Sequence, residues 1–125
     1  MALDVSIRKY GSVPVLQVAG RIVDVDAKRF SRRLEALCNK GGQLIVVDIT
    51  RVNFIDSHGL GILVYFQTIM QRSSRELVIL NSNLNPNAYT NRLFDLTNLN
   101  KVMRIIGSLN DLGIDTPKPL TSIPH

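Results

Sequence analysis

A continuous run of branched apolar residues, Leu44 to Val47, constrains the fold of this chain more than any other stretch. A strand with one solvated face alternates apolar and polar residues, whereas a strand covered on both faces, as in a parallel sheet, does not alternate. A helical pattern of apolar residues, from Leu60 to Met70, follows this run after a polar turn. A buried strand followed by such a helix predicts an α/β fold.

The remaining periodic segments predict that strands and helices alternate after an initial hairpin. The predicted strands are Val5–Lys9, Val13–Ala19, Leu44–Asp48, Glu76–Leu80 and Val102–Ile106. The first predicted helix runs from near Asp26 to near Lys40, the second from near Leu60 to near Arg72, and the third from near Asn85 to near Asn98. Asp26, and Asn85 before Pro86, are the predicted N-caps of the first and third helices. The short turn after Lys9 makes the first two strands antiparallel. We therefore expect a single domain with a mainly parallel central sheet, one antiparallel edge strand and helices packed on it.

The length of 125 residues fits one compact domain, which we place at residues 1–112, with a short last helix from Ser108. Residues 113–125 carry three prolines and little apolar content, so we expect a flexible C-terminal tail there. No apolar run is long enough to span a bilayer, and the N-terminus lacks the features of a signal peptide. The single cysteine, Cys38, is compatible with a reducing compartment. These features predict a soluble, cytoplasmic protein.

The net charge of +5 raises the question of nucleic acid binding. In the densest basic stretch, Lys28, Arg29, Arg32 and Arg33 alternate with apolar residues at helical spacing, so they form the outer face of an amphipathic helix. A solvated helix face explains this pattern without any ligand, and no base-reading motif accompanies it. We therefore expect no direct contact with nucleic acid, and a patch for an acidic protein partner is the alternative role of this face.

The usual signatures of catalysis and cofactor binding are missing from the sequence. No glycine-rich loop ends in Lys-Ser or Lys-Thr, and the pair Gly59-x-Gly61 lacks the third glycine of a dinucleotide-binding fingerprint. His58 is adjacent to Ser57, and neighbours at the start of a helix point apart, so this pair does not suit a nucleophile and its base. No cysteine and histidine cluster has the spacing of a metal site. The residue inventory predicts a protein without catalytic activity, cofactor or bound metal.

The polar turn between the central strand and the second helix holds most of the groups able to carry a function. Ser57 stands where the chain enters the helix, so composition and spacing favour a helix N-cap over a modification site. Asp56 either satisfies N–H groups of the turn or contacts a partner. Gly59 and Gly61 each cost up to about 1 kcal/mol in a helix, which indicates that something approaches the backbone there. His58 has no evident structural role and is expected to be exposed.

A longer motif spans this turn. The stretch from Asp48 to Gly61, DITxxxFIDSHGLG, resembles the signature of the anti-sigma factor antagonist family, whose fold is called the STAS domain. Val15 to Gly20, followed by Arg21-Ile22, resembles the family's second strand and its glycine, and Arg92 to Leu99 resembles its third helix and the following turn. The resemblance covers roughly residues 3 to 112 and implies the STAS fold.

The resemblance also implies a partner switch without catalytic activity in this chain. In that family, the unmodified antagonist binds an anti-sigma factor that is also a serine kinase of the histidine-kinase-like ATPase class, and this binding frees the sigma factor. The kinase phosphorylates the serine that matches Ser57, which ends the binding. A metal-dependent serine phosphatase then restores the antagonist.

The contact surface implied by the resemblance comprises the loop after the second strand, the serine turn and the start of the second helix. Its members in this chain are Asp24, Asp56, His58, Gly59, Leu60 and Gly61, with Ser57 as the phosphorylation site. The family commonly has an acidic residue three positions after the second-strand glycine, where this chain has Val23. Asp24, the next residue, is the candidate for that role.

Two other functions remain open. STAS domains also assist membrane transport complexes, and a free-standing accessory subunit would use the basic first helix near acidic head groups. A sensor of a small ligand or nucleotide would use the N-terminus of the second helix. The sequence offers no aromatic or basic group near Ser57 to hold the rest of such a ligand, which disfavours this function.

Overall fold

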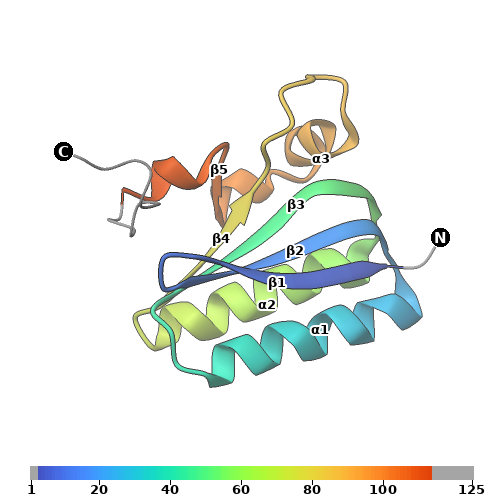
Figure 1. Ribbon diagram of the computed structural model, residues 1–125. Helices are drawn as coiled ribbons and strands as arrows, with labels where there is room; N and C mark the ends of the chain where they lie inside the picture. Colours follow the sequence, from blue (N-terminus) through green and yellow to red (C-terminus); the bar gives the residue numbers. More distant parts are fainter. Residues whose placement is uncertain (1–2, 114–125) are drawn as a thin grey trace.

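The computed structural model describes residues 3–113, which form a five-stranded sheet with three α-helices (Figure 1). In chain order the elements are β1 (Asp4–Tyr10), β2 (Val13–Ile22), α1 (Asp24–Asn39), β3 (Leu44–Ile55), α2 (Ser57–Arg72), β4 (Glu76–Leu80), α3 (Tyr89–Thr97), the 3-10 helix η1 (Leu99–Lys101), β5 (Arg104–Ile106) and the 3-10 helix η2 (Leu109–Leu112). The predicted order of strands and helices is confirmed, and β4 has the predicted bounds.

The strands lie across the sheet in chain order, β1-β2-β3-β4-β5. β1 is antiparallel to β2 and every later pair is parallel, so the prediction of one antiparallel edge strand is confirmed. The β1–β2 turn places Gly11 at φ 64°, a left-handed conformation that glycine adopts readily. β2 and β3 end together, with Ile22 opposite Ile55, so the loops that follow them emerge at the same end of the sheet.

Both faces of the central strands are covered, as their continuous apolar run predicts. Ile45, Val46 and Val47 are all fully buried, and a buried side chain of this size contributes roughly 1.5–3 kcal/mol. On one face, α1 and α2 lie side by side and enclose the larger hydrophobic core (Figure 1). On the other face, Val46 belongs to a smaller cluster against which Leu109 and Leu112 of η2 pack.

Several elements differ from their predicted bounds: β2 extends to Ile22 and β5 begins only at Arg104, and specific contacts explain the differences in β3 and α3. β3 continues past Asp48 to Ile55, because β2 extends alongside it and pairs with it over that length. α3 begins at Tyr89 rather than just after Asn85, because the Asn85 side chain accepts a hydrogen bond from the N–H of Asn87 (2.9 Å). That contact makes a turn of the chain instead of capping a helix, and asparagine suits both arrangements.

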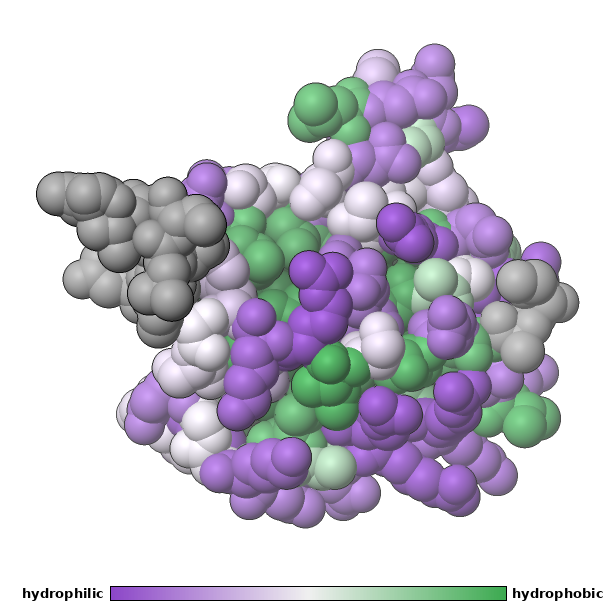
Figure 2. Space-filling view, viewed as in Figure 1, coloured by the Kyte–Doolittle hydropathy of each residue, from purple (hydrophilic) through white to green (hydrophobic). Residues whose placement is uncertain are grey.

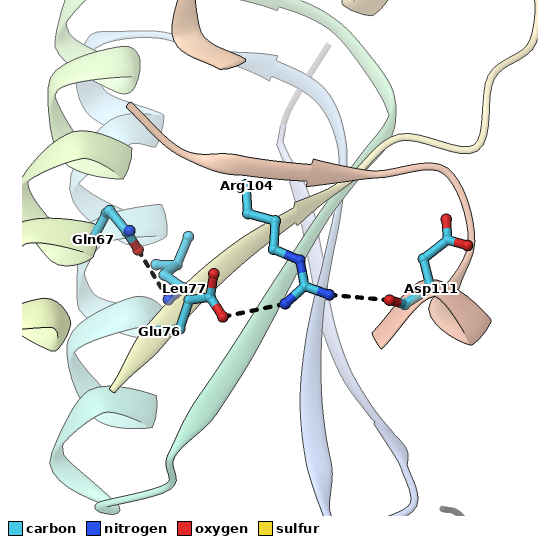
Figure 3. Close-up of polar contacts among 5 residues, drawn as sticks. All are labelled: Gln67, Glu76, Leu77, Arg104 and Asp111. Atoms are coloured by element: carbon cyan, nitrogen blue, oxygen red, sulfur yellow. Dashed lines mark hydrogen bonds and ion pairs between the residues drawn. The ribbon is translucent and has the colours of Figure 1, made fainter. Parts of the chain in front are cut away.

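Polar contacts join α2, β4, β5 and η2 (Figure 3). Gln67 of α2 is buried, and its side-chain oxygen accepts a hydrogen bond from the N–H of Leu77 in β4 (3.0 Å). Arg104 of β5 forms an ion pair with Glu76 (3.4 Å) and donates to the carbonyl oxygen of Asp111 (3.0 Å). Exposed ion pairs contribute at most about 1 kcal/mol, so the Arg104–Glu76 pair adds little stability, and the bond to Asp111 attaches η2 to β5.

The described residues end just after η2. Gly113 ends this 3-10 helix in a left-handed conformation, with φ 69°. Beyond Gly113, the flexible tail predicted for residues 113–125 lies outside the described residues. Within residues 3–113, no helix is both long enough and apolar enough to cross a membrane.

Candidate functional site

The turn singled out by the sequence lies where β2 and β3 end side by side (Figure 1). The N–H of Asp56 donates to the carbonyl of Ile22 (3.1 Å) and joins the two strand ends. From there the chain enters α1 at Asp24 and α2 at Ser57. The predicted contact residues of the two loops, Asp24 on one and Asp56 to Gly61 on the other, are therefore brought together.

Asp56 is the N-cap of α2, so the prediction that Ser57 caps this helix is wrong. Asp56 Oδ1 accepts a hydrogen bond from the N–H of Gly59 (2.9 Å), and Oδ2 accepts one from the N–H of Asp24 (3.3 Å). Asp24 has φ 35°, which is uncommon for residues other than glycine, and the contact with Asp56 holds its backbone in place. Asp56 thus connects the starts of both helices and has a structural role.

The start of α1 also differs from the prediction. Val23 is the residue before the helix, and its carbonyl accepts hydrogen bonds from the N–H groups of Asp26 (2.8 Å) and Ala27 (3.1 Å). Asp26 therefore lies in the first turn instead of capping it, where a carboxylate is favoured by the helix dipole. Val23 is half-buried, whereas Asp24 is exposed. The loop thus presents the carboxylate of Asp24 on its surface.

Ser57 is the first residue of α2 and is exposed. Because Asp56 supplies the cap, the hydroxyl of Ser57 makes no hydrogen bond to another group of the described chain. His58 is exposed as expected. Across residues 3–113, no three His, Cys, Asp or Glu side chains are grouped so as to hold a metal ion. An exposed hydroxyl beside N–H groups that favour an anion is chemically suited to accept a phosphate from another enzyme.

The two glycines of the turn have different surroundings. A Cβ on Gly59 would lie 2.6 Å from Cγ1 of Ile55 and 2.8 Å from Cγ2 of Ile22. The group that approaches the backbone at Gly59 is therefore the chain's own core, and glycine lets α2 pack directly on the two strand ends. A Cβ on Gly61 would meet nothing within 4 Å, and this residue is exposed. Gly61 leaves open space on the outer side of α2.

Two further side chains shape this turn and were missed by the sequence analysis. The Tyr89 hydroxyl, from α3, accepts a hydrogen bond from the N–H of Ile55 (2.9 Å) and donates one to its carbonyl (3.1 Å). The guanidinium of Arg21 lies 4.8 Å from the ring centre of Phe54, and that ring lies 5.9 Å from the ring of Tyr89. These contacts fix the end of β3 immediately before Asp56. Periodicity carries no signal for them, because they join separate elements.

Two surface grooves flank the start of α2. The basic groove, of about 270 Å³, lies between α1 and α2 and is lined by Ala27, Lys28, Ser31, Arg32, His58 and Ile62. The apolar groove, of about 520 Å³, lies between α2 and α3, and its lining includes Ile55, Leu60, Tyr89, Arg92, Leu93 and Leu96. The predicted contact residues His58 and Leu60 therefore face different grooves.

The hydrogen bonds to Asp56 make the stability of the fold depend on pH. The bond from Gly59, the largest cause, and the bond from Asp24 lower the pKa of the Asp56 carboxyl, against an opposing effect of burial. Because the folded pKa is below the unfolded value of about 4, the charged cap stabilises the fold above that pH. This stabilisation is lost as the pH falls through the folded pKa.

Asp56→Asn is therefore expected to lower the free energy of unfolding at pH 7, and the difference from the wild type should narrow below about pH 4. Urea denaturation at a series of pH values measures this difference. Asp95→Asn is the matched control, because Asp95 is exposed on α3 and caps no helix. A difference that stays constant down to about pH 3 would contradict the assigned role of the carboxylate.

Comparison with known proteins agrees with the sequence motif. The family model described as the STAS domain matches residues 4–112. An anti-sigma-B factor antagonist of Listeria monocytogenes is 36% identical over 89 residues, which cover 70% of this chain and 74% of that protein.

Solved structures share the fold. An anti-sigma factor antagonist from Mycobacterium paratuberculosis superposes with a TM-score of 0.72 and 23% identity, covering 88% of this chain and 90% of the other. The Bacillus cell fate determinant SpoIIAA, in its phosphorylated form, gives a TM-score of 0.63 and 13% identity, covering 88% and 97%. The fold prediction is confirmed, and this chain belongs to the STAS domain family.

Proposed function

We propose that this chain is an anti-sigma factor antagonist whose binding to an anti-sigma factor is ended by phosphorylation of Ser57. The observation that carries the proposal is the exposed hydroxyl of Ser57, which Asp56 releases from helix capping. Similarity to the Listeria anti-sigma-B factor antagonist supports the class of partner. The chain is then a binding module and a kinase substrate, with no catalytic step of its own.

A phosphate on Ser57 would mainly change the binding of a partner at this surface. At the start of α2 it meets a favourable helix dipole and also the repulsion of Asp56, so neither effect alone drives a rearrangement of the fold. It would add a charge of about −1.5 to −2 to the exposed surface. That surface carries Asp24, His58 and Gly61, all exposed, and these residues are the proposed partner contacts together with Asp56, Gly59 and Leu60.

The proposed partners follow from this switch. The anti-sigma factor is a serine kinase of the histidine-kinase-like ATPase class, and a metal-dependent serine phosphatase removes the phosphate. The cytoplasm is the proposed location, since sigma factors act on transcription there. Neither the proposed binding nor the proposed release requires a cofactor on this chain.

The proposal is tested by release of a sigma factor. Each purified anti-sigma factor of the source organism is loaded with its fluorescently labelled sigma factor, and release is followed by fluorescence anisotropy as this protein is added. We expect release by the wild type and by Ser57→Ala. Prior treatment with the kinase and ATP should abolish release by the wild type only. If no anti-sigma factor releases its sigma factor, the proposed function is wrong.

The alternative is a free-standing accessory subunit of a membrane transport complex. The basic outer face of α1, with Lys28 and Arg32 exposed, favours it by attraction to acidic head groups. Co-purification with a membrane ATPase, together with an unmodified Ser57 in cells, would support this alternative over the proposed switch.

A further inference from the structure

The basic groove carries positive charge that no acidic group of the described chain pairs with. Lys28 and Arg32 lie one helical turn apart on α1, and His58 faces the same groove from α2. No carboxylate lines the groove. Within residues 3–113 the only ion pair joins Arg104 and Glu76, on β5 and β4. The cations of the groove are therefore available to a charge from outside.

We propose that the basic groove binds an acidic side chain, aspartate or glutamate, on the anti-sigma factor. The inference rests on the proposed function and names the charge of the partner's surface where it meets α1. Ala27 and Ile62 are buried and form apolar parts of the lining, which suit the methylene groups of such a side chain. Lys28 and Arg32 then pair with its carboxylate.

The position of the groove connects it to the switch. His58 lines the groove and directly follows Ser57 in the chain, so a partner surface that contacts both residues extends over the mouth of the groove. A phosphate on Ser57 would place negative charge beside that mouth. It would repel the incoming carboxylate and compete with it for the same cations. Phosphorylation would thus weaken the proposed contact as well as add bulk to the surface.

A protein side chain fits this site better than a membrane surface does. The cations line a concavity of about 270 Å³, a shape that suits a single projecting side chain. The surface over α1 is mainly hydrophilic (Figure 2), and Phe30, the one aromatic residue of this helix, is buried. The outer face also carries the exposed Glu35, which would face acidic lipids unfavourably.

The test compares two double variants that change net charge equally. Lys28→Glu/Arg32→Glu reverses the groove, and Arg8→Glu/Lys9→Glu reverses two exposed residues of the edge strand β1. Isothermal titration calorimetry gives the affinity of each for every purified anti-sigma factor that the wild type binds. We expect the groove variant to lose about 30-fold or more in affinity and the β1 variant to stay within about threefold. Circular dichroism checks that both variants are folded.

The outcomes separate this inference from the proposed function. Equal affinities of the two double variants would overturn the acidic contact and leave the antagonist function intact. If the wild type binds no anti-sigma factor, the proposed function fails and the inference fails with it. Sedimentation with vesicles of phosphatidylcholine and phosphatidylserine is the third arm. A groove variant that loses vesicle binding but keeps its affinity for the anti-sigma factor would identify a lipid-binding face and overturn the inference.

Discussion

Replacing Ser57 with aspartate is expected to weaken binding of the anti-sigma factor by about 100-fold or more, whereas Ser57→Ala should stay within about threefold of the wild type. Ser57 is exposed next to Asp56, whose carboxylate already lies at this turn. A second carboxylate would be buried by the partner beside a like charge, which costs about 3 kcal/mol or more. Alanine removes only a hydroxyl that caps nothing. Calorimetric titration of the two variants measures the difference, and equal affinities would contradict the switch.

A matched control distinguishes the effect of a charge at Ser57 from the general effect of adding a negative charge to the protein. Ser12→Asp makes the same change at the exposed β1–β2 turn, at the opposite end of β2 from the site, and should bind like the wild type. Loss of folding is not the expected reason for weak binding by Ser57→Asp. A carboxylate in the first turn of a helix is favoured by the helix dipole, which offsets its repulsion by Asp56, so thermal denaturation should show stability close to that of the wild type.

Gly59→Ala is expected to lower the free energy of unfolding by about 2 kcal/mol, despite the better helix propensity of alanine. The added Cβ would lie 2.6 Å from Ile55 and 2.8 Å from Ile22. Both isoleucines are buried, at 4% and 0% exposure, and the contacting carbons are attached directly to their branched Cβ atoms. These atoms cannot rotate away without a new rotamer, so α2 must shift from the strand ends. Urea denaturation measures the loss.

Gly61→Ala is the control, and its effect should have the opposite sign. Nothing lies within 4 Å of the added Cβ, and the residue is exposed in the same helical turn. Alanine should therefore raise the free energy of unfolding by up to about 1 kcal/mol through helix propensity alone. Destabilisation by both substitutions would show that the helix start needs glycine for a reason other than packing on the core.

The architecture can be predicted from the sequence because the apolar pattern within each segment shows which of its faces are buried. The continuous run from Leu44 to Val47 can be satisfied only by cover on both faces, and β3 has that cover. The helical pattern after it continues to Met70, which is buried against the sheet. The position of the site follows from the same elements, because the polar turn connects the end of this strand to the start of this helix.

The details of the site depend on contacts between distant segments. Asp56 and Ser57 are equally good helix caps, so local sequence does not decide between them. The extension of β3 to Ile55 and the N–H of Asp24 on the neighbouring loop decide in favour of Asp56. The basic groove likewise exists only because α1 packs beside α2. Lys28 and Arg32 can be identified from the sequence, but the sequence does not show that His58 lines the same groove.

The most direct measurement of the central claim is the phosphorylation state of this protein in its own cells. Intact mass spectrometry of protein isolated under several growth conditions, with and without phosphatase treatment, counts the phosphates, and peptide mapping locates them. The switch predicts a species with a single phosphate on Ser57 that phosphatase removes. A protein that is never phosphorylated, or is phosphorylated only at other residues, would contradict it.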